Sequence, residues 1–305
     1  MRNTFVKTLV DIAENDDQIC LITGDLGFGV LTPFMEKYPQ RFINAGIAEQ
    51  NMTGVAAGMA KEGKKVVTYS IGNFPTMRCL EQIRNDCAYH KANVKIVSVG
   101  GGFVYGAHGM SHHATEDIAI MRALPDVKVF APGDLVEAKE VTKAMLKTDG
   151  TCYLRLGKGG EQQIHHNLQN FEIGKAIKIS EGNNIAIFST GAILDEAVQT
   201  RKNLEMLGIS VAQYSFPTIK PIDRKAIINV AKNVKIIVTI EEHNIIGGLG
   251  SAVAEVMAEE ERVAKLVRIG LNDEYTTIVG NHNYLREQYG MSANRITERI
   301  LKIIK

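Results

Sequence analysis

Short apolar runs alternate with segments of helical periodicity along most of the chain. In the first half, five apolar runs predict strands at 19–23, 65–70, 94–99, 127–130 and 152–156. Apolar residues at helical spacing predict helices between them at 77–89, 115–124 and 135–146. Strands that alternate with helices in this way predict a mainly parallel sheet that is covered by helices on both faces.

The same pattern is repeated after a break rich in glycine and polar residues. The Gly-Lys-Gly-Gly run and the polar segment after it predict a linker at 157–170. Further strands are expected at 185–189, 211–216, 235–240 and 265–269, followed by a last helix at 293–304. With 305 residues the chain is long enough for two cores. We therefore predict two doubly wound α/β domains, at 1–160 and 171–305.

Composition excludes several classes of protein. The net charge is +1 and no long basic run is present, so we expect no nucleic-acid partner. No apolar run approaches the roughly 20 residues that a membrane span requires, and we expect no membrane association. The first 17 residues resemble an amphipathic helix and lack a signal peptide's apolar centre. Four cysteines without CxxC spacing indicate a cytoplasmic protein with reduced thiols.

The stretch 42–60 combines a short strand, a turn and a helix rich in small residues. Gly54, Ala57 and Gly58 recur at helical spacing, which leaves one helix face almost bare. Such a face favours tight packing, either within the chain or across a dimer. Glu49 stands at the start of this helix, where an acid complements the helix dipole. A carboxylate beside a closely packed helix also loses water and holds a proton more strongly, so Glu49 is a candidate proton carrier as well, although this stretch alone favours the structural role.

The loop 100–113 has five glycines and three histidines. The glycines permit close approach of the backbone to a ligand. His108 and His112 have the i,i+4 spacing of metal ligands, but Gly106 and Gly109 argue against a helix, and no Cys or Asp completes a set. We predict no metal here, and instead a histidine that faces a substrate.

Other candidates follow predicted strands, and ligands bind at the carboxyl ends of strands in such sheets. Phe74 is either a stacking platform or a core aromatic. Arg155 and Lys158 are either anion-binding groups or surface charges. Asp25 belongs to a Gly-Asp-Leu-Gly run that only faintly resembles the metal-binding GDG…N signature of thiamine diphosphate enzymes, because its third position is Leu26. We interpret Asp25 as a helix cap or an inter-subunit polar contact.

Three motifs in order resemble the C-terminal half of transketolase. They are Gly46-Ile47-Ala48-Glu49-Gln50, the helix with Glu81-Gln82-Ile83-Arg84, and Gly106-Ala107-His108-Gly109-Met110-Ser111-His112. The resemblance covers the pyrimidine-binding domain at 1–160 and the C-terminal domain at 171–305. Deoxyxylulose phosphate synthase and the β-subunits of 2-oxo acid dehydrogenases share the architecture and match less well.

The resemblance implies thiamine diphosphate as cofactor and assigns roles to individual residues. Glu49 is implied to hydrogen-bond the aminopyrimidine ring nitrogen and so to favour the imino tautomer that takes the thiazolium proton. Phe74 is implied to stack on the pyrimidine ring and Leu26 to hold the bent cofactor. His112 is implied to face the oxygen atoms of the substrate.

Two departures from the family pattern shape our hypothesis. The half that binds diphosphate and Mg²⁺ is missing, which implies a partner subunit and active sites between chains in an α2β2 assembly. His108 replaces the aspartate that reads a substrate hydroxyl, Gly100 replaces a phosphate-binding histidine, and Lys158 replaces an arginine. With His108, Arg155 and Lys158 expected to shape specificity, phosphorylated, non-phosphorylated, sulfonated and nucleotide-linked sugars all remain open.

The sequence therefore predicts the C-terminal subunit of a split transketolase, which moves a two-carbon ketol unit from a ketose to an aldose. The alternative enzymes are a β-subunit of a decarboxylating 2-oxo acid dehydrogenase and a deoxyxylulose-phosphate-synthase-like enzyme. The non-enzyme alternative is a silent half that scaffolds or regulates a partner.

Overall fold

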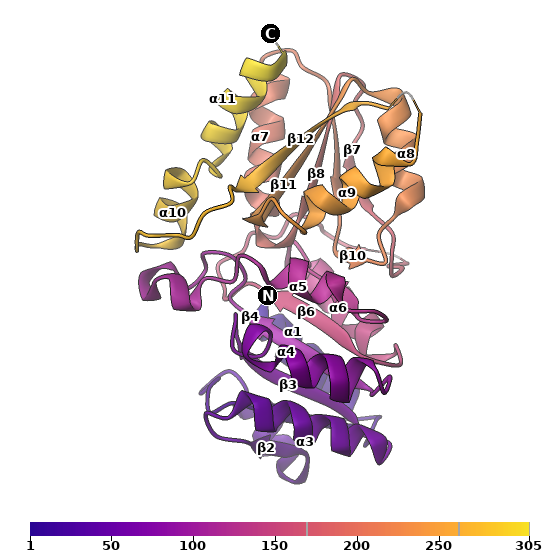
Figure 1. Ribbon diagram of the computed structural model, residues 1–305, viewed down its shortest axis with the longest axis vertical. Coiled ribbons are helices and arrows are strands. Elements are labelled where there is room, and N and C mark those ends of the chain that lie inside the picture. Colours follow the sequence, from indigo (N-terminus) through magenta and orange to yellow (C-terminus); the bar gives the residue numbers. More distant parts are fainter. Residues whose placement is uncertain (169, 262, 305) are drawn as a thin grey trace.

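The computed structural model describes residues 1–168, 170–261 and 263–304. Position 169 of the predicted linker and positions 262 and 305 of the predicted second domain lie outside the described residues. Two α/β units are stacked along the long axis of the molecule, with the N terminus near their junction and the C terminus at the far end (Figure 1). This confirms the predicted fold class.

The first unit is built on a seven-stranded sheet with the strand order β10-β5-β6-β4-β3-β1-β2. Neighbouring strands are parallel except for β10, which pairs antiparallel with β5. The strands are β1 (Ile19–Thr23), β2 (Phe42–Asn44), β3 (Lys65–Ile71), β4 (Val94–Val99), β5 (Lys128–Phe130), β6 (Cys152–Leu156) and β10 (Thr218–Lys220). Since β10 comes from the second half of the chain, the halves interlock, which the sequence patterns did not predict.

The helices of the first unit lie on both faces of this sheet. They are α1 (Arg2–Ala13), α2 (Thr32–Lys37), α3 (Glu49–Lys61), α5 (Asp117–Ala123) and α6 (Leu135–Leu146), with a short 3-10 turn η1 (Pro39–Arg41). The predicted helix at 77–89 is a composite of 3-10, α and π turns, namely η2 (Met77–Cys79), α4 (Leu80–Gln82) and η3 (Ile83–Ala88). π turns inside helices occur frequently at functional sites.

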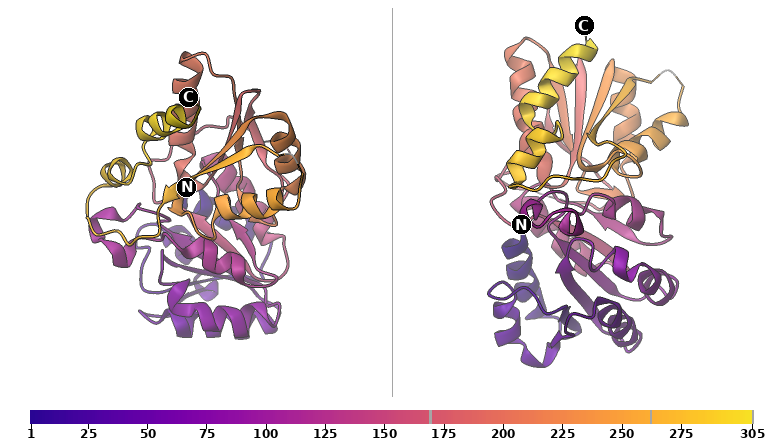
Figure 2. Two further views of the ribbon diagram at one scale, coloured as in Figure 1. Left: turned by 45° about the horizontal axis from the view of Figure 1, so that its top comes forward. Right: turned by 60° about the vertical axis from the view of Figure 1, so that its left-hand side comes forward.

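The second unit has a five-stranded sheet with the order β12-β11-β8-β9-β7, in which only β7 is antiparallel to its neighbour. Helices cover both faces, as two further views show (Figure 2). Its strands are β7 (Ile177–Ser180), β8 (Ile185–Thr190), β9 (Val211–Ser215), β11 (Ile236–Asn244) and β12 (Lys265–Leu271). Its helices are α7 (Leu194–Met206), α8 (Arg224–Asn233), α9 (Leu249–Ala258), α10 (His282–Gln288) and α11 (Ala293–Ile304), with a 3-10 turn η6 (Gly191–Ile193).

Each sheet is buried on both faces, which explains its continuous apolar strands. In β1, Leu21 belongs to one buried cluster and Ile22 to the cluster on the opposite face. In β8, Ile187 and Phe188 divide in the same way. A strand with two covered faces needs apolar residues at successive positions rather than at alternate ones. Within the part of the chain that the structure describes, no helix combines the length and apolarity needed to cross a membrane.

Candidate functional site

The ends of four neighbouring strands bring the predicted site residues to one edge of the first sheet. The register pairs Thr23 with Tyr69, Ile71 with Val99, and Val99 with Leu156. The segments that follow β1, β3, β4 and β6 therefore leave the sheet side by side. This is the edge at which parallel α/β sheets bind ligands.

Glu49 is the first residue of α3, and its carboxylate is buried under the ends of β1 and β3. The residue is 1% exposed. Its Oε2 accepts a hydrogen bond from Arg78 Nη1 at 2.6 Å, and its Oε1 accepts one from Ser70 Oγ at 3.2 Å. Gly24 makes room for it, because a Cβ at that position would lie 3.2 Å from the Glu49 side chain. Glu49 is thus both the N-terminal acid of the helix and a desolvated carboxylate.

Phe74 packs against the Arg78 side chain that pairs with this carboxylate, and His112 packs against Phe74. The Arg78 guanidinium is 4.7 Å from the centre of the half-buried Phe74 ring, and the His112 ring meets the edge of that ring at 5.2 Å. Sequence analysis missed Arg78. The local signal that could have identified Arg78 is its position four residues after Phe74 in the same segment. Its side chain is 43% exposed, so the only cation on Glu49 among the described residues can move without disturbing the core.

The tip of the loop after β4 carries a second group of rings. The loop forms two 3-10 turns, η4 (Gly106–His108) and η5 (Met110–His112), which bring the His108 and His112 rings to 5.0 Å. Tyr105 lies 5.8 Å from the His108 ring and 4.9 Å from Lys158 Nζ. Burial, helped by the nearby His108, lowers the pKa of His112, which favours a neutral imidazole there.

The glycines at the base of this loop leave space that other side chains of the protein fill. A Cβ at Gly100 would lie 2.2 Å from the Tyr105 ring, and one at Gly102 would lie 2.2 Å from the Glu242 carboxylate. A Cβ at Gly101 would lie 2.4 Å from Arg155 Nε. The expectation that these glycines admit a ligand is wrong at these three positions, since Tyr105, Arg155 and Glu242 of this chain already occupy the space.

Arg155 lies inside the protein at the junction of the two units. It is 4% exposed, and its Nε donates to Asp117 Oδ2 at 2.9 Å. Its Nη2 donates to the backbone oxygens of Ala114 and Glu242 at 2.7 and 2.9 Å. These contacts give Arg155 a structural role, so we leave it out of the proposed substrate site. Lys158, in contrast, is exposed.

Two residues of the loop after β1 lie beside the site. Leu26 is half-buried, packs against the first-domain core, and accepts a hydrogen bond from Thr23 Oγ1 through its backbone oxygen. Asp25 is exposed and exchanges two hydrogen bonds with Asn44, of 2.9 and 3.1 Å. The interpretation of Asp25 as a helix cap is therefore wrong.

Comparison with known proteins identifies the architecture. Residues 1–161 match the family model described as the transketolase pyrimidine binding domain, and residues 174–296 match the transketolase C-terminal domain. This chain belongs to the transketolase family.

Relatives of similar length support the same assignment. A Methanocaldococcus jannaschii protein named as a transketolase C-terminal section is 39% identical, over 100% of this chain and 96% of that protein. A 6-deoxy-6-sulfo-D-fructose transketolase subunit of a Clostridium species is 35% identical, over 97% of this chain and 92% of its own length. A solved structure described as a split-gene transketolase in an inactive β4 tetramer is 35% identical and superposes with a TM-score of 0.88, covering 99% of this chain and 96% of that one.

Membership of the transketolase family implies a transferase that depends on thiamine diphosphate, and the residues present fit one end of that cofactor. Glu49 offers a buried hydrogen-bonding carboxylate, and Phe74 offers an aromatic face beside it. Asp25, the acid of the loop after β1, is hydrogen-bonded to Asn44. Across residues 1–168, 170–261 and 263–304, one cluster has the composition and spacing of a metal site, formed by Asp134, Glu137 and His165. It contains none of the predicted site residues, and Asp134 there caps α6.

Proposed function

We propose that this chain is the C-terminal subunit of a split transketolase and moves a two-carbon ketol unit from a ketose to an aldose. The observation that carries the proposal is the buried Glu49 carboxylate beside the Phe74 ring, with a half-exposed arginine as its counter-ion. A carboxylate and an aromatic face in this arrangement match what an aminopyrimidine ring requires, namely a hydrogen-bond partner and a stacking surface.

Each residue of the site then has a defined task. Bound thiamine diphosphate supplies the nucleophilic carbon for the ketol transfer. Glu49 would hydrogen-bond the pyrimidine nitrogen and exchange a proton with it, and Phe74 would support the ring. Leu26, in the loop after β1, would help to hold the bent cofactor. His112, whose pKa burial lowers, exchanges a proton with a substrate oxygen. Arg78 leaves Glu49 when the pyrimidine enters, since both compete for the same carboxylate.

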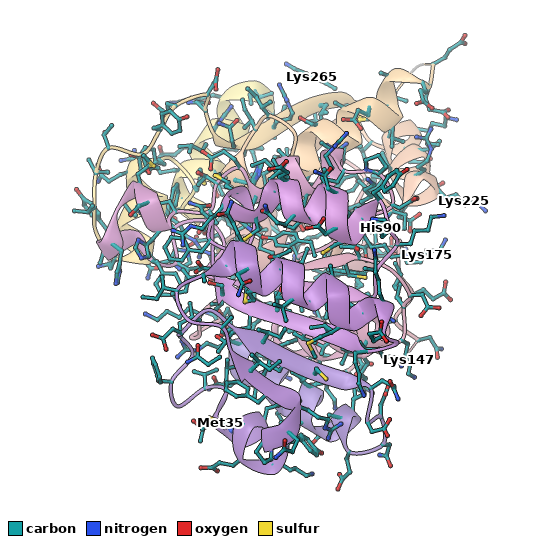
Figure 3. All side chains as sticks on the ribbon, turned by 60° about the horizontal axis from the view of Figure 1, so that its bottom comes forward. Met35, His90, Lys147, Lys175, Lys225 and Lys265 are labelled. Atoms are coloured by element: carbon teal, nitrogen blue, oxygen red, sulfur yellow. The ribbon has the colours of Figure 1, made fainter. Side chains whose placement is uncertain are left out.

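We propose an N-terminal partner subunit that carries Mg²⁺ and the diphosphate site, in an α2β2 assembly. Apolar side chains are exposed in the loop after β1 and just before the Glu49 helix, where a partner would cover them: Phe28 is 81% and Ile47 is 79% exposed. Met35, which Figure 3 labels, is 41% exposed at the same end of the molecule. Gly54 and Gly58 have open space at their Cβ positions, so no described residue of this chain fills that helix face.

The proposed substrate is a ketose with an anionic group at its distal end, either a phosphate or a sulfonate. Lys158 and His108 flank Tyr105 at the tip of the loop, beyond His112 as seen from Glu49. A lysine and a histidine suit an anion, and the Clostridium relative is named for a sulfonated sugar. We also propose a cytoplasmic location, with which four buried free cysteines are compatible.

The test is reconstitution with the N-terminal subunit from the same cells. The complex should bind thiamine diphosphate with Mg²⁺ and transfer a ketol unit without releasing carbon dioxide. Release of carbon dioxide from a 2-oxo acid would overturn the proposal in favour of a dehydrogenase or a deoxyxylulose-phosphate-synthase-like enzyme. A complex that binds no cofactor would favour a scaffold.

A further inference from the structure

The substrate loop is held from the second unit through one buried carboxylate, that of Glu242 in β11. Its Oε1 accepts a hydrogen bond from the backbone N–H of Phe103 at 2.6 Å, across the junction of the two units. The Gly102 backbone is in contact with the same carboxylate, because a Cβ there would lie 2.2 Å from Oε1. Phe103 and Gly102 form the base of the loop whose tip carries His108 and His112.

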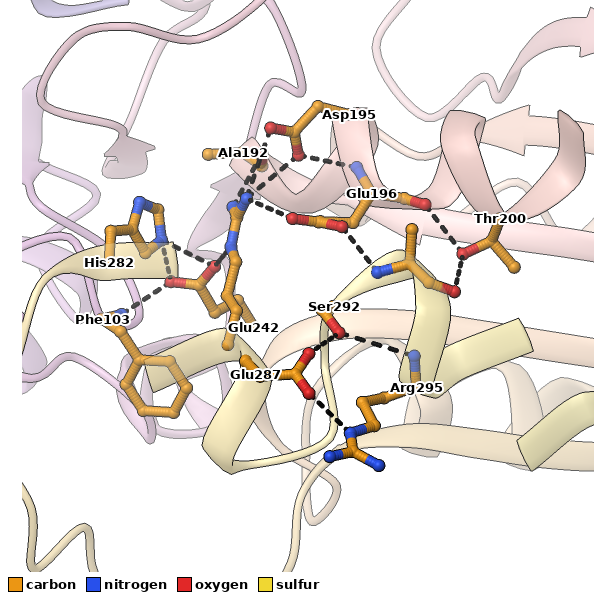
Figure 4. Close-up of polar contacts among 12 residues, drawn as sticks. Phe103, Ala192, Asp195, Glu196, Thr200, Glu242, His282, Glu287, Ser292 and Arg295 are labelled. Atoms are coloured by element: carbon orange, nitrogen blue, oxygen red, sulfur yellow. Dashed lines mark hydrogen bonds and ion pairs between the residues drawn. The ribbon is translucent and has the colours of Figure 1, made fainter. Parts of the chain in front are cut away.

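Glu242 is itself fixed by basic side chains of the second unit (Figure 4). Its Oε2 accepts from Arg286 Nε at 2.5 Å, and both of its oxygens lie within 2.9 Å of His282 Nε2. Arg286 is 2% exposed and also binds Asp195. Burial alone would raise the pKa of Glu242, but Arg286 and His282 hold it well below the usual range, so the carboxylate is ionised.

A second contact holds the other end of the loop. His113 is buried, with Nδ1 2.6 Å from Thr276 Oγ1 of the second unit and Nε2 3.3 Å from the backbone oxygen of Gly106. The loop tip between Phe103 and His113 is therefore suspended from the second unit at both ends. The positions of His108 and His112 depend on these anchors.

We propose that Glu242 is a positioning residue for the transferase reaction, through which the C-terminal domain fixes the substrate loop. The proposal rests on the proposed function, since it assigns the loop to the substrate. No orientation of a glutamine can replace Glu242, because both of its oxygens accept hydrogen bonds, and the amide nitrogen would face a donor in either orientation.

The first test needs neither cofactor nor partner: hydrogen–deuterium exchange of peptides covering 100–113 in the chain alone. In the Glu242→Gln protein the backbone amides of this loop should exchange at least about tenfold faster, because local opening becomes easier. Glu241→Gln is the matched control, since Glu241 is equally buried in the same strand but accepts hydrogen bonds from Leu249 and Gly250. It should leave exchange of the loop unchanged.

A second variant guards against a Glu242→Gln protein that fails to fold. Gly102→Ala disturbs the same contact from the loop side, without removing any buried ion pair. Gly208→Ala is its control, because Gly208 also has a positive φ but open space at its Cβ position. Faster loop exchange in Gly102→Ala but not in Gly208→Ala supports the proposal. Unchanged loop exchange in the folded Glu242→Gln and Gly102→Ala proteins overturns it.

The second test uses the complex with the N-terminal subunit. Glu242→Gln should lower kcat/KM for the sugar by about tenfold, because a misplaced loop loses reactive geometry. The apparent affinity for thiamine diphosphate should stay within twofold, since Glu49 and Phe74 lie on other elements. Faster loop exchange with unchanged kcat/KM in the Glu242→Gln complex would overturn the positioning role. A wild-type complex without ketol transfer would instead refute the proposed function.

Discussion

Two buried glutamates, Glu49 and Glu242, have contrasting surroundings. Glu49 has one ion pair, with an arginine that is 43% exposed, and a hydroxyl at 3.2 Å. Glu242 has Arg286, His282 and the Phe103 N–H, all within 2.9 Å. Burying a carboxylate is expensive unless its hydrogen bonds are complete. The difference indicates that Glu242 is satisfied by its own chain, whereas Glu49 has room for a partner that comes from outside.

The sharpest test of this contrast is Glu49→Gln in the assembled complex. A neutral amide keeps the shape but cannot exchange the proton that the proposed role requires, so kcat should fall by about 10²- to 10⁴-fold. The measurement is ketol transfer at saturating sugar and cofactor. Glu62→Gln, at the exposed end of α3, should keep full activity. A Glu49→Gln complex within threefold of wild type would remove Glu49 from the mechanism.

The next test compares the two arginines. Arg286→Met leaves Glu242 buried without its main counter-ion and should lower the free energy of unfolding by about 3–5 kcal/mol. Arg78→Met removes a partner that is 43% exposed, and water that enters its place can hydrate Glu49, so the loss should be smaller, about 1–2 kcal/mol. Urea unfolding of the chain alone measures both. Equal losses would mean that Glu49 depends on its own chain as strongly as Glu242 does.

The stability of the junction between the two units should also depend on pH through His243, the neighbour of Glu242 in β11. Its Nδ1–H donates to the Asn244 oxygen and its Nε2 accepts from the Ala119 N–H, so the fold requires the neutral ring. Burial lowers the pKa of His243 to about 4, from an ordinary value of 6.5. The unfolded chain therefore takes up the proton first, and stability present above pH 6.5 is lost as the pH falls towards 4, by about 3 kcal/mol.

Urea unfolding between pH 7 and pH 4 measures this loss. The contribution of His243 is the difference in pH dependence between the wild type and His243→Gln, in which glutamine offers one donor and one acceptor without titrating. The difference is needed because Glu137 and Glu241, whose pKa values burial raises to about 7, titrate in the same window with the opposite sign. His90→Gln, at an exposed position, should keep the wild-type profile. An unchanged profile in His243→Gln would show that the junction tolerates the charged ring.

The smallest effect is expected at the tip of the loop. His108→Asp removes a neighbour that lowers the pKa of His112 and places a carboxylate near the His112 ring, so the pKa of His112 should rise. An NMR titration of the His112 ring checks the direction, and competition between sugars checks the expected change of preference. His166→Asp, in the exposed linker, should change neither. A fixed pKa together with an unchanged preference would remove His108 from the substrate site.

Much of the fold followed from local pattern. The strand at 94–99 and the helices at 135–146 and 293–304 are confirmed with the same bounds. Continuous apolar runs bounded by turn residues identify strands that are buried on both faces. The strands that were missed, β7 and β10, have four and three residues and lie at sheet edges. Such strands carry little periodicity, and the pairing of β10 with β5 depends on the tertiary fold.

The site was predictable in its members but less so in their contacts. Glu49, Phe74, His112, His108 and Lys158 follow strands or begin a helix, and they meet at one edge as expected from the topology. The residues that hold the site and its loop in place were not predictable. Arg78, Glu242 and Asp117 act through contacts between residues 29 to 139 positions apart in the chain. No local spacing encodes which of two charges, Arg155 or Lys158, turns inward.

The position of β10 limits where the gene for such a chain could be split into two. Ile219 of this strand is buried in a core cluster of the first unit, and the Ala131 N–H donates to the Pro217 oxygen. A gene break within 157–170 would part β5 from its antiparallel neighbour and open an apolar sheet edge to aggregation. We therefore expect selection to keep the two domains on one polypeptide, although the linker between them resembles a natural place for fission.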